Sequence, residues 1–128
     1  MFELSQTSRK RLEGVNPRLI EVIELALQLT KVDFGIPKHG GKRIASEQHE
    51  LYLQKLSQLD GYKRLSKHQS GNAFDVFAYV NGKASWDLDD LAHVATAILA
   101  AASQLGVKLA WGGHWTKFVD APHFEMVD

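Results

Sequence analysis

The stretch Ser66-Lys67-His68-Gln69-Ser70-Gly71-Asn72-Ala73-Phe74-Asp75 places a histidine in a glycine-containing loop and an aspartate in the segment that follows. Residues 73–80 are rich in aromatic and branched side chains and end at the turn-forming pair Asn81-Gly82, so they predict a strand. Asp75 then lies between apolar neighbours. Because an unpaired carboxylate is costly to bury, we expect a cation to compensate its charge.

The strand leaves two arrangements open for Asp75. Strand alternation puts Asp75 on the same face as Phe77 and Tyr79, so one face of the strand carries a site and the other faces the core. The compensating cation is either a metal ion or an arginine, and Arg43 and Arg64 are the candidates for a structural salt bridge.

A second stretch with site character is Asp120-Ala121-Pro122-His123-Phe124-Glu125. Pro122 favours an extended backbone, so His123 and Glu125 are expected on one face of an edge strand. Two histidines and a carboxylate are a common zinc ligand set in hydrolases, with a fourth position open to water whose proton a nearby carboxylate can take. Taken singly, each histidine is more typical of a surface residue, and Asp120 of a turn cap.

The remaining elements predict an α+β fold, with helices packed on a small antiparallel sheet that carries the zinc site. Asn16-Pro17 begins the first helix, Ser46 is the expected N-cap of a short second helix, and Gly106 ends the third. The expected helices cover 17–31, a short segment after 46, and 87–105. The expected strands cover 73–80, 107–111 and 122–127. Residues 33–42 are expected to form a loop or a short strand with turns, and 60–72 an irregular connection.

Composition limits the classes of function. The 128 residues suit a single domain, 1–128, and the balance of 45% hydrophobic and 23% charged residues is that of a folded protein. Fifteen basic and fifteen acidic residues leave no net charge to attract nucleic acid or an anionic membrane. Without cysteine, a metal must be held by nitrogen and oxygen. No apolar run suits a signal peptide or a membrane span, so we expect synthesis in the cytoplasm without membrane insertion. We also expect a monomer.

Both stretches resemble one known family. Residues 66–75 match the Ser-x-His-x-x-Gly-x-Ala-x-Asp signature of the zinc D-alanyl-D-alanine peptidases and L-alanyl-D-glutamate endopeptidases, and Asp120-x-x-His123 matches their second motif. Trp111-Gly112-Gly113 and the stretch through Glu125 look like the phage endolysin branch. Gly41-Lys42-Arg43 with Glu47-Gln48 resembles the family's arginine region, so the resemblance runs from Gly41 to the end.

The resemblance implies roles for individual residues. It implies His68, Asp75 and His123 as zinc ligands, Asp120 as general base, Arg43 as the group that polarises the scissile carbonyl, and Ser66 as a secondary contact. The base is an aspartate where D-Ala-D-Ala members commonly have glutamate, which favours the endolysin branch. Glu125 is expected either to accept the second ring hydrogen of a ligand histidine or to face solvent.

Other aromatic and histidine residues have plainer interpretations. His39, His49 and His93 are expected to face solvent or to bond locally, without partner carboxylates at useful spacing. His114 is close to the site in sequence and is a candidate substrate contact. The aromatic residues Trp111, Trp115 and Phe118 are expected either in the core or as a substrate wall.

The implied function is hydrolysis of a peptidoglycan stem peptide, at the bond between L-alanine and D-glutamate. The implied enzyme is a phage lysin, or a prophage remnant of one, that reaches the host cell wall after release and causes lysis. A D-Ala-D-Ala carboxypeptidase with the same site is the alternative. A non-catalytic zinc-binding module is a further alternative from a different class, and the presence of Asp120 and Arg43 beside all three ligands argues against it.

Overall fold

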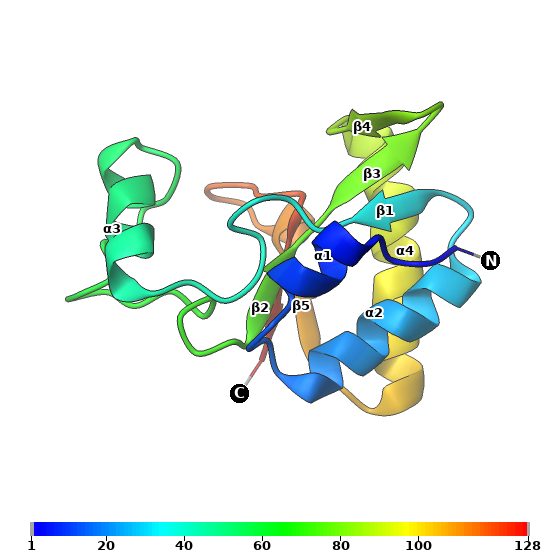
Figure 1. Cartoon of the computed structure of the whole chain (residues 1–128), viewed down its shortest axis with the longest axis horizontal. Coiled ribbons are helices and arrows are strands. Elements are labelled where there is room, and N and C mark those ends of the chain that lie inside the picture. Colours follow the sequence, from blue (N-terminus) through cyan, green and yellow to red (C-terminus); the bar gives the residue numbers. More distant parts are fainter. Residues whose placement is uncertain (1, 128) are drawn as a thin grey trace.

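Two helices, α2 (Pro17–Leu29) and α4 (Leu88–Leu105), pack against each other in the computed structural model, which describes residues 2–127 (Figure 1). Apolar residues at helical spacing face the contact, Leu19, Val22, Ile23, Ala26 and Leu27 in α2 and mainly alanines with Leu91, Val94 and Ile98 in α4. Met1 and Asp128, which the expected domain range 1–128 includes, lie outside the described residues.

Within residues 2–127 the strands form two antiparallel sheets of three strands each. One has the order β1-β3-β4, with β1 at Asp33–Gly35, β3 at Phe77–Val80 and β4 at Lys83–Ser85. The other has the order β2-β6-β5, with β2 at Ala73–Asp75, β6 at His123–Met126 and β5 at Leu109–Trp111. The expected α+β class of helices on small antiparallel sheets is confirmed.

The expected continuous strand 73–80 is wrong, because the chain leaves one sheet and enters the other at Val76. Its amide donates to the Pro122 carbonyl at 2.9 Å, and its side chain is fully buried. The residues before Val76 pair with β6 and the residues after it pair with β1 and β4. Asp75 therefore does not share a sheet face with Phe77 and Tyr79. Two diverging sets of pairing partners, rather than local preference, interrupt the strand.

The helix boundaries differ from expectation in small ways. Asn16 caps α2 by accepting from the Arg18 amide, but α2 ends at Leu29 rather than Lys31. The N-cap of α3 (Ala45–Leu53) is Ile44, with no side-chain bond, so Ser46 is not the cap. A short helix α1 (Gln6–Arg11) and a 3-10 turn η1 (Gly112–His114) were not expected, whereas Gly106 ends α4 in the left-handed conformation as predicted.

The α3 helix and the irregular chain that follows it stand apart from the two-helix layer, on the left of Figure 1. We call residues 44–65 the α3 segment. In the view of Figure 1, β2 lies between this segment and α2, and Phe74 of β2 stacks on Phe124 of β6 in the core with ring centroids 5.3 Å apart. Buried Phe74 and Phe124 thus fix β2 against β6, and this pairing positions the site. Among the described residues no helix has the length and apolarity to cross a membrane.

Candidate metal centre

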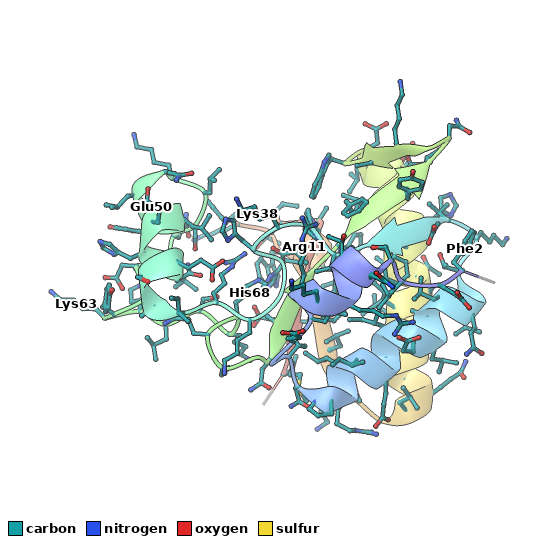
Figure 2. All side chains as sticks on the ribbon, viewed as in Figure 1. Phe2, Arg11, Lys38, Glu50, Lys63 and His68 are labelled. Carbon is teal, nitrogen blue, oxygen red and sulfur yellow. The ribbon has the colours of Figure 1, made fainter. Side chains whose placement is uncertain are left out.

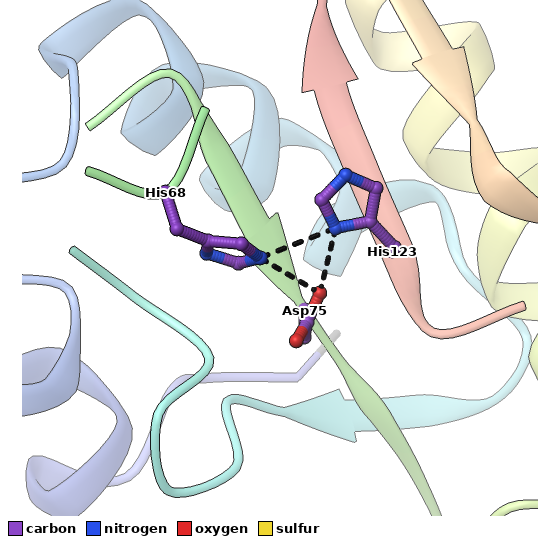
Figure 3. A group of neighbouring side chains, drawn as sticks. All are labelled: His68, Asp75 and His123. Atoms are coloured by element: carbon purple, nitrogen blue, oxygen red, sulfur yellow. Dashed lines mark hydrogen bonds and ion pairs between the residues drawn. The ribbon is translucent and has the colours of Figure 1, made fainter. Parts of the chain in front are cut away.

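The pairing register of β2 and β6 brings Asp75 directly opposite His123. His68 comes from the turn that precedes β2, and its imidazole reaches the same point (Figure 3). Asp75 Oδ1 lies 3.0 Å from His123 Nδ1 and 3.2 Å from His68 Nε2, and the two nitrogens are 3.2 Å apart. Three potential metal ligands from two strands and a loop therefore converge on one position.

The opposite ring nitrogen of each histidine has its own acceptor. His68 Nδ1 lies 2.8 Å from the Gly41 carbonyl oxygen, and His123 Nε2 lies 2.8 Å from Glu125 Oε1. A proton on each of these nitrogens leaves the lone pairs of His68 Nε2 and His123 Nδ1 directed at Asp75. Two nitrogen lone pairs and one carboxylate oxygen at such short range repel one another unless a cation or a proton lies between them. The donor set thus fits a divalent metal with nitrogen and oxygen ligands.

The segment 40–43 holds the ligand loop in place by backbone contacts. The Gly40 carbonyl accepts from the Asp75 amide at 2.8 Å, and the Arg43 amide donates to the His68 carbonyl at 3.0 Å. A Cβ on Gly41 would lie 1.9 Å from the Arg11 carbonyl oxygen, so only glycine lets this segment approach α1. The segment therefore packs closely against the α1 backbone on one side and bonds to the backbone of His68 and Asp75 on the other.

Protonation of the cluster reflects the same geometry. Burial by itself would raise the pKa of Asp75, but the interactions with His68 and His123 outweigh it and hold that pKa well below its usual range. Burial would lower the pKa of His123, but hydrogen bonds to Asp75 and Glu125 raise it to about 9. In the absence of a metal, a proton on His123 therefore satisfies the two carboxylates that flank it.

Arg43 binds the second carboxylate oxygen of Asp75. Its Nη2 lies 3.1 Å from Asp75 Oδ2, its Nε donates to the His39 carbonyl at 2.8 Å, and its Nη1 donates to Gln48 Oε1 at 2.9 Å. The Arg43 side chain is only 11% exposed. Of the two arginines considered as partners of Asp75, Arg43 forms the salt bridge and Arg64 does not. A salt bridge and a metal site are not alternatives here, because each uses a different oxygen of Asp75.

Asp120 and Ser66 also lie at this site, while His114 does not. Asp120 lines the same pocket as the histidine pair and Arg43, and burial, followed by the charge of Asp75, raises its pKa. Ser66 is buried and its Oγ accepts from the His68 amide at 3.2 Å. His114 packs edge-on against Trp111 at 4.8 Å and is not among the residues that line the pocket. The structure thus brings Asp120 and Ser66, but not His114, to the ligand cluster.

A pocket of about 710 Å³ opens from this cluster toward the α3 segment. Its apolar lining comes from Leu51, Leu56, Leu59 and Leu65 on the α3 segment and from Trp86, Trp115 and Phe118 on other parts of the chain. Trp115 lies 5.3 Å from the His123 ring, between ring centroids. Of the three aromatic residues left open by the sequence, Trp115 and Phe118 therefore belong to the pocket wall, and Trp111 packs against the core.

A family model described as phage L-alanyl-D-glutamate peptidase matches residues 1–127 of the chain. The chain belongs to this family. The L-alanyl-D-glutamate peptidase of Escherichia phage T5 is 35% identical over 115 residues, which cover 89% of this chain and 82% of the phage protein. The resemblance to the phage endolysin branch and the expectation of a peptidase are confirmed.

Solved structures give the same result for the fold of this family member. The L-Ala D-Glu endopeptidase ChiX of Serratia marcescens is 35% identical and superposes with a TM-score of 0.85, over 98% of this chain and 90% of that chain. DacB from Streptococcus pneumoniae D39 is 22% identical with a TM-score of 0.53, over 94% of this chain and 70% of that chain, and shows likeness of fold alone.

Sequence reasoning missed two features of the pocket in this family member. His39 lines the pocket and its Nδ1 contacts the Glu47 carboxylate, so the expectation that it lacks a partner carboxylate is wrong. Glu47 is an acidic residue in the first turn of α3, and its position in the sequence was the signal from which a pairing with His39 could have been predicted. Trp86 lies outside every motif, and no sequence signal indicated it. Two arrangements were expected for Glu125, and the structure shows the first of them, the contact with the second ring nitrogen of His123.

Proposed function

We propose that the protein is a zinc-dependent endopeptidase that cleaves peptidoglycan stem peptides between L-alanine and D-glutamate. The observation that carries this proposal is the convergence of His68, Asp75 and His123 in a member of the phage L-alanyl-D-glutamate peptidase family. The relatives from phage T5 and Serratia marcescens carry this bond in their names. The substrate is therefore a stem peptide of the bacterial cell wall.

We assign the metal to zinc and its protein ligands to His68 Nε2, His123 Nδ1 and Asp75 Oδ1. Two imidazoles and one carboxylate, with no cysteine in the chain, suit a catalytic zinc site that keeps a position for water or substrate. Zinc in such a site supplies Lewis acidity, which lowers the pKa of water toward about 7 and polarises a carbonyl. Glu125 and the Gly41 carbonyl orient the two imidazoles through their opposite ring nitrogens.

Asp120 is the proposed general base. It lies in the pocket beside the ligands, and a pKa raised by burial makes its carboxylate a better proton acceptor than an exposed aspartate. Asp120 takes the proton of the attacking water and delivers it to the leaving amine as the peptide bond breaks. The short aspartate arm is compensated by backbone placement, since the Asp120 amide donates to the Gly112 carbonyl at 3.0 Å.

Arg43 has two roles in the proposal. Three of its five N–H groups are bound, to Asp75, Gln48 and the His39 carbonyl, which holds the guanidinium rigidly at the pocket wall. The remaining two are available to the scissile carbonyl, where negative charge develops in the transition state.

Ser66 supports the ligand loop through the His68 amide. All these groups belong to one chain, so we propose that a single domain, 1–128, acts as a monomer.

The biological setting follows from the same assignment. We propose that a phage uses the protein to degrade the host wall from within at lysis, after synthesis in the host cytoplasm and release toward the wall. The net charge of zero offers no general attraction to nucleic acid or to an anionic membrane, so the wall peptide is the expected partner.

Mass analysis of fragments released from purified peptidoglycan, with and without a chelator, tests the proposal. Cleavage at L-Ala–D-Glu leaves the glycan with its lactyl-L-alanine and releases a peptide that begins with D-glutamate, and the chelator abolishes it. Release of free D-alanine instead would identify a carboxypeptidase and leave the zinc assignment intact. Metal binding without release of any fragment would identify a non-catalytic module.

A further inference from the structure

The pocket carries an excess of positive charge although the whole chain has none. Five lysine and arginine residues and three acidic residues line it, whereas the chain has fifteen of each kind. A divalent metal at the ligand cluster adds to this excess. Charges of one sign in a concave site attract a ligand of the opposite sign more strongly than charges spread over a convex surface. The pocket is therefore suited to an anionic ligand.

Two of the three acidic residues and two of the cations are engaged at the ligand cluster, and the third acidic residue, Asp120, is the proposed base. Asp75 binds Arg43 and the two histidines, and Glu125 binds His123 and lies 3.6 Å from Lys67 Nζ. Lys67 Nζ also donates to the Met126 carbonyl. These groups neutralise one another and fix the ligands, so they leave the anion-binding capacity of the pocket to its other cations.

Three cations of the pocket remain available, and we refer to Lys38, Arg64 and Lys117 as the pocket cations. Within the described part of the chain none of them forms a salt bridge, and all three are exposed. Each comes from a different segment, one from the loop after β1, one from the α3 segment and one from the loop between η1 and β6. Figure 2 shows both Lys38 and His68 in the region between α3 and α1. The three pocket cations therefore line the pocket from three separate segments instead of clustering on one loop.

The substrate of the proposed reaction has a matching charge. A D-glutamate residue joined to L-alanine through its amino group has two carboxyl groups, and the continuing peptide uses only one of them. The other remains a carboxylate within a few bonds of the scissile amide. We propose that the pocket cations recognise this free carboxylate and make the enzyme selective for stems in which it is not amidated. This inference rests on the proposed function and adds a specificity to it.

The strength of this selection follows from the exposure of the cations. Each exposed pair with a carboxylate contributes modestly, so neutralising one pocket cation should lower kcat/KM by about two- to fivefold. Because three cations act on one carboxylate, converting it to a carboxamide should lower kcat/KM by about tenfold or more. Screening by salt should reduce the preference, since the contacts are solvent-accessible.

The test compares two peptides that differ at one group, N-acylated L-Ala-D-Glu stems with the free carboxyl either ionised or converted to the carboxamide. Both are assayed with the zinc-loaded native protein, with Lys38→Gln, Arg64→Gln and Lys117→Gln, and with the triple variant. Lys83→Gln is the matched control, since Lys83 is an exposed lysine on β4 that does not line the pocket. Zinc content and melting temperature are measured for each protein and are expected to be unchanged.

The quantity to follow is the ratio of kcat/KM for the acid to kcat/KM for the amide. We expect a ratio of about ten or more for the native protein and Lys83→Gln, a smaller ratio in each single variant and a ratio near one in the triple variant. Equal cleavage of both peptides by the native protein, or a preference that survives in the triple variant, would overturn the inference while the peptidase assignment stands. Failure to cleave either peptide would instead refute the proposed function, and the inference with it.

Discussion

Gly112 and Asp120 lie in direct backbone contact across the turn that leads into β6. The Asp120 amide donates to the Gly112 carbonyl at 3.0 Å, and a Cβ built on Gly112 would lie 2.2 Å from the Asp120 carbonyl oxygen. No side chain fits between the two backbones. The glycine therefore sets the position of the proposed base, and it connects the Trp111-Gly112-Gly113 stretch to the proposed catalytic role of Asp120.

Gly112→Ala should displace Asp120 and spare the metal ligands. Displacement of a catalytic group by about 1 Å can lower turnover by about a hundredfold, and we expect a loss of this order with zinc content retained. Steady-state kinetics and metal analysis of the same preparation check the expectation. Gly82→Ala is the control, because it strains a backbone with φ of 77° where no atom lies within 4 Å of the added Cβ. It should cost stability without affecting turnover, and normal turnover in Gly112→Ala would refute the packing explanation.

Asp120 and Asp75 should separate into base and ligand by mutation. Asp120→Asn should fold, keep zinc and lose turnover by a factor of about 10² to 10⁴, with substrate affinity changed much less. The acidic limb of its pH–rate profile should flatten, because the group with the raised pKa is gone. Asp75→Asn should lose zinc affinity and stability, since it removes a charged ligand that Arg43 also binds. Loss of zinc from Asp120→Asn and retention in Asp75→Asn would mean that the two roles are exchanged.

His68→Ala should lose both metal and activity. Its imidazole is 2% exposed and occupies the space between the Gly41 carbonyl and Asp75, so its removal leaves buried polar groups without partners. The melting temperature should fall, and added zinc should no longer raise it, because metal binding is part of the folding free energy of the native protein. His114→Ala, which changes an exposed imidazole outside the pocket, should keep one zinc per chain. A zinc-loaded His68→Ala would exclude this residue as a ligand.

The metal-free protein should lose stability as the pH rises from 6.5 to about 9. The pKa of His123 rises from 6.5 to about 9 on folding, so its contribution is fully present below 6.5 and is lost as the pH passes 9. At the acid end the sign is opposite, because the depressed pKa of Asp75 gives a contribution that is present above 3.8 and lost as the pH falls. Melting temperatures of the chelator-treated protein between pH 5 and 10 measure the loss of stability expected from His123.

Zinc should reverse the alkaline dependence. A metal displaces the proton from His123 Nδ1, so zinc affinity should increase with pH up to about 9 and binding should release a proton. Calorimetry in two buffers of different ionisation enthalpy counts that proton. A metal-free protein with constant stability across the window, or zinc binding without proton release, would contradict the assignment of His123 as the shared site of proton and metal.

Local patterns in the sequence singled out the clustered residues better than they predicted the sheets. His68, Asp75, Asp120 and His123 stand in two short stretches that match motifs of a known family, and the structure brings all four side chains to one pocket. Helix limits followed equally local signals, such as the Asn16-Pro17 start of α2 and the Gly106 end of α4. The change of sheet at Val76 had no such signal, since either half of 73–80 alone has ordinary strand character.

The sequence by itself determined which side chains can bind the metal and that helices accompany short strands, because these depend on residue type and near neighbours. Tertiary structure alone decided that Asp75 faces His123, since the register of β2 on β6 follows from packing of the buried Phe74 and Phe124. It also decided that Arg43 binds the free oxygen of Asp75. The tertiary structure also decided the positive charge of the pocket, because side chains from three distant segments line one pocket only when the chain folds.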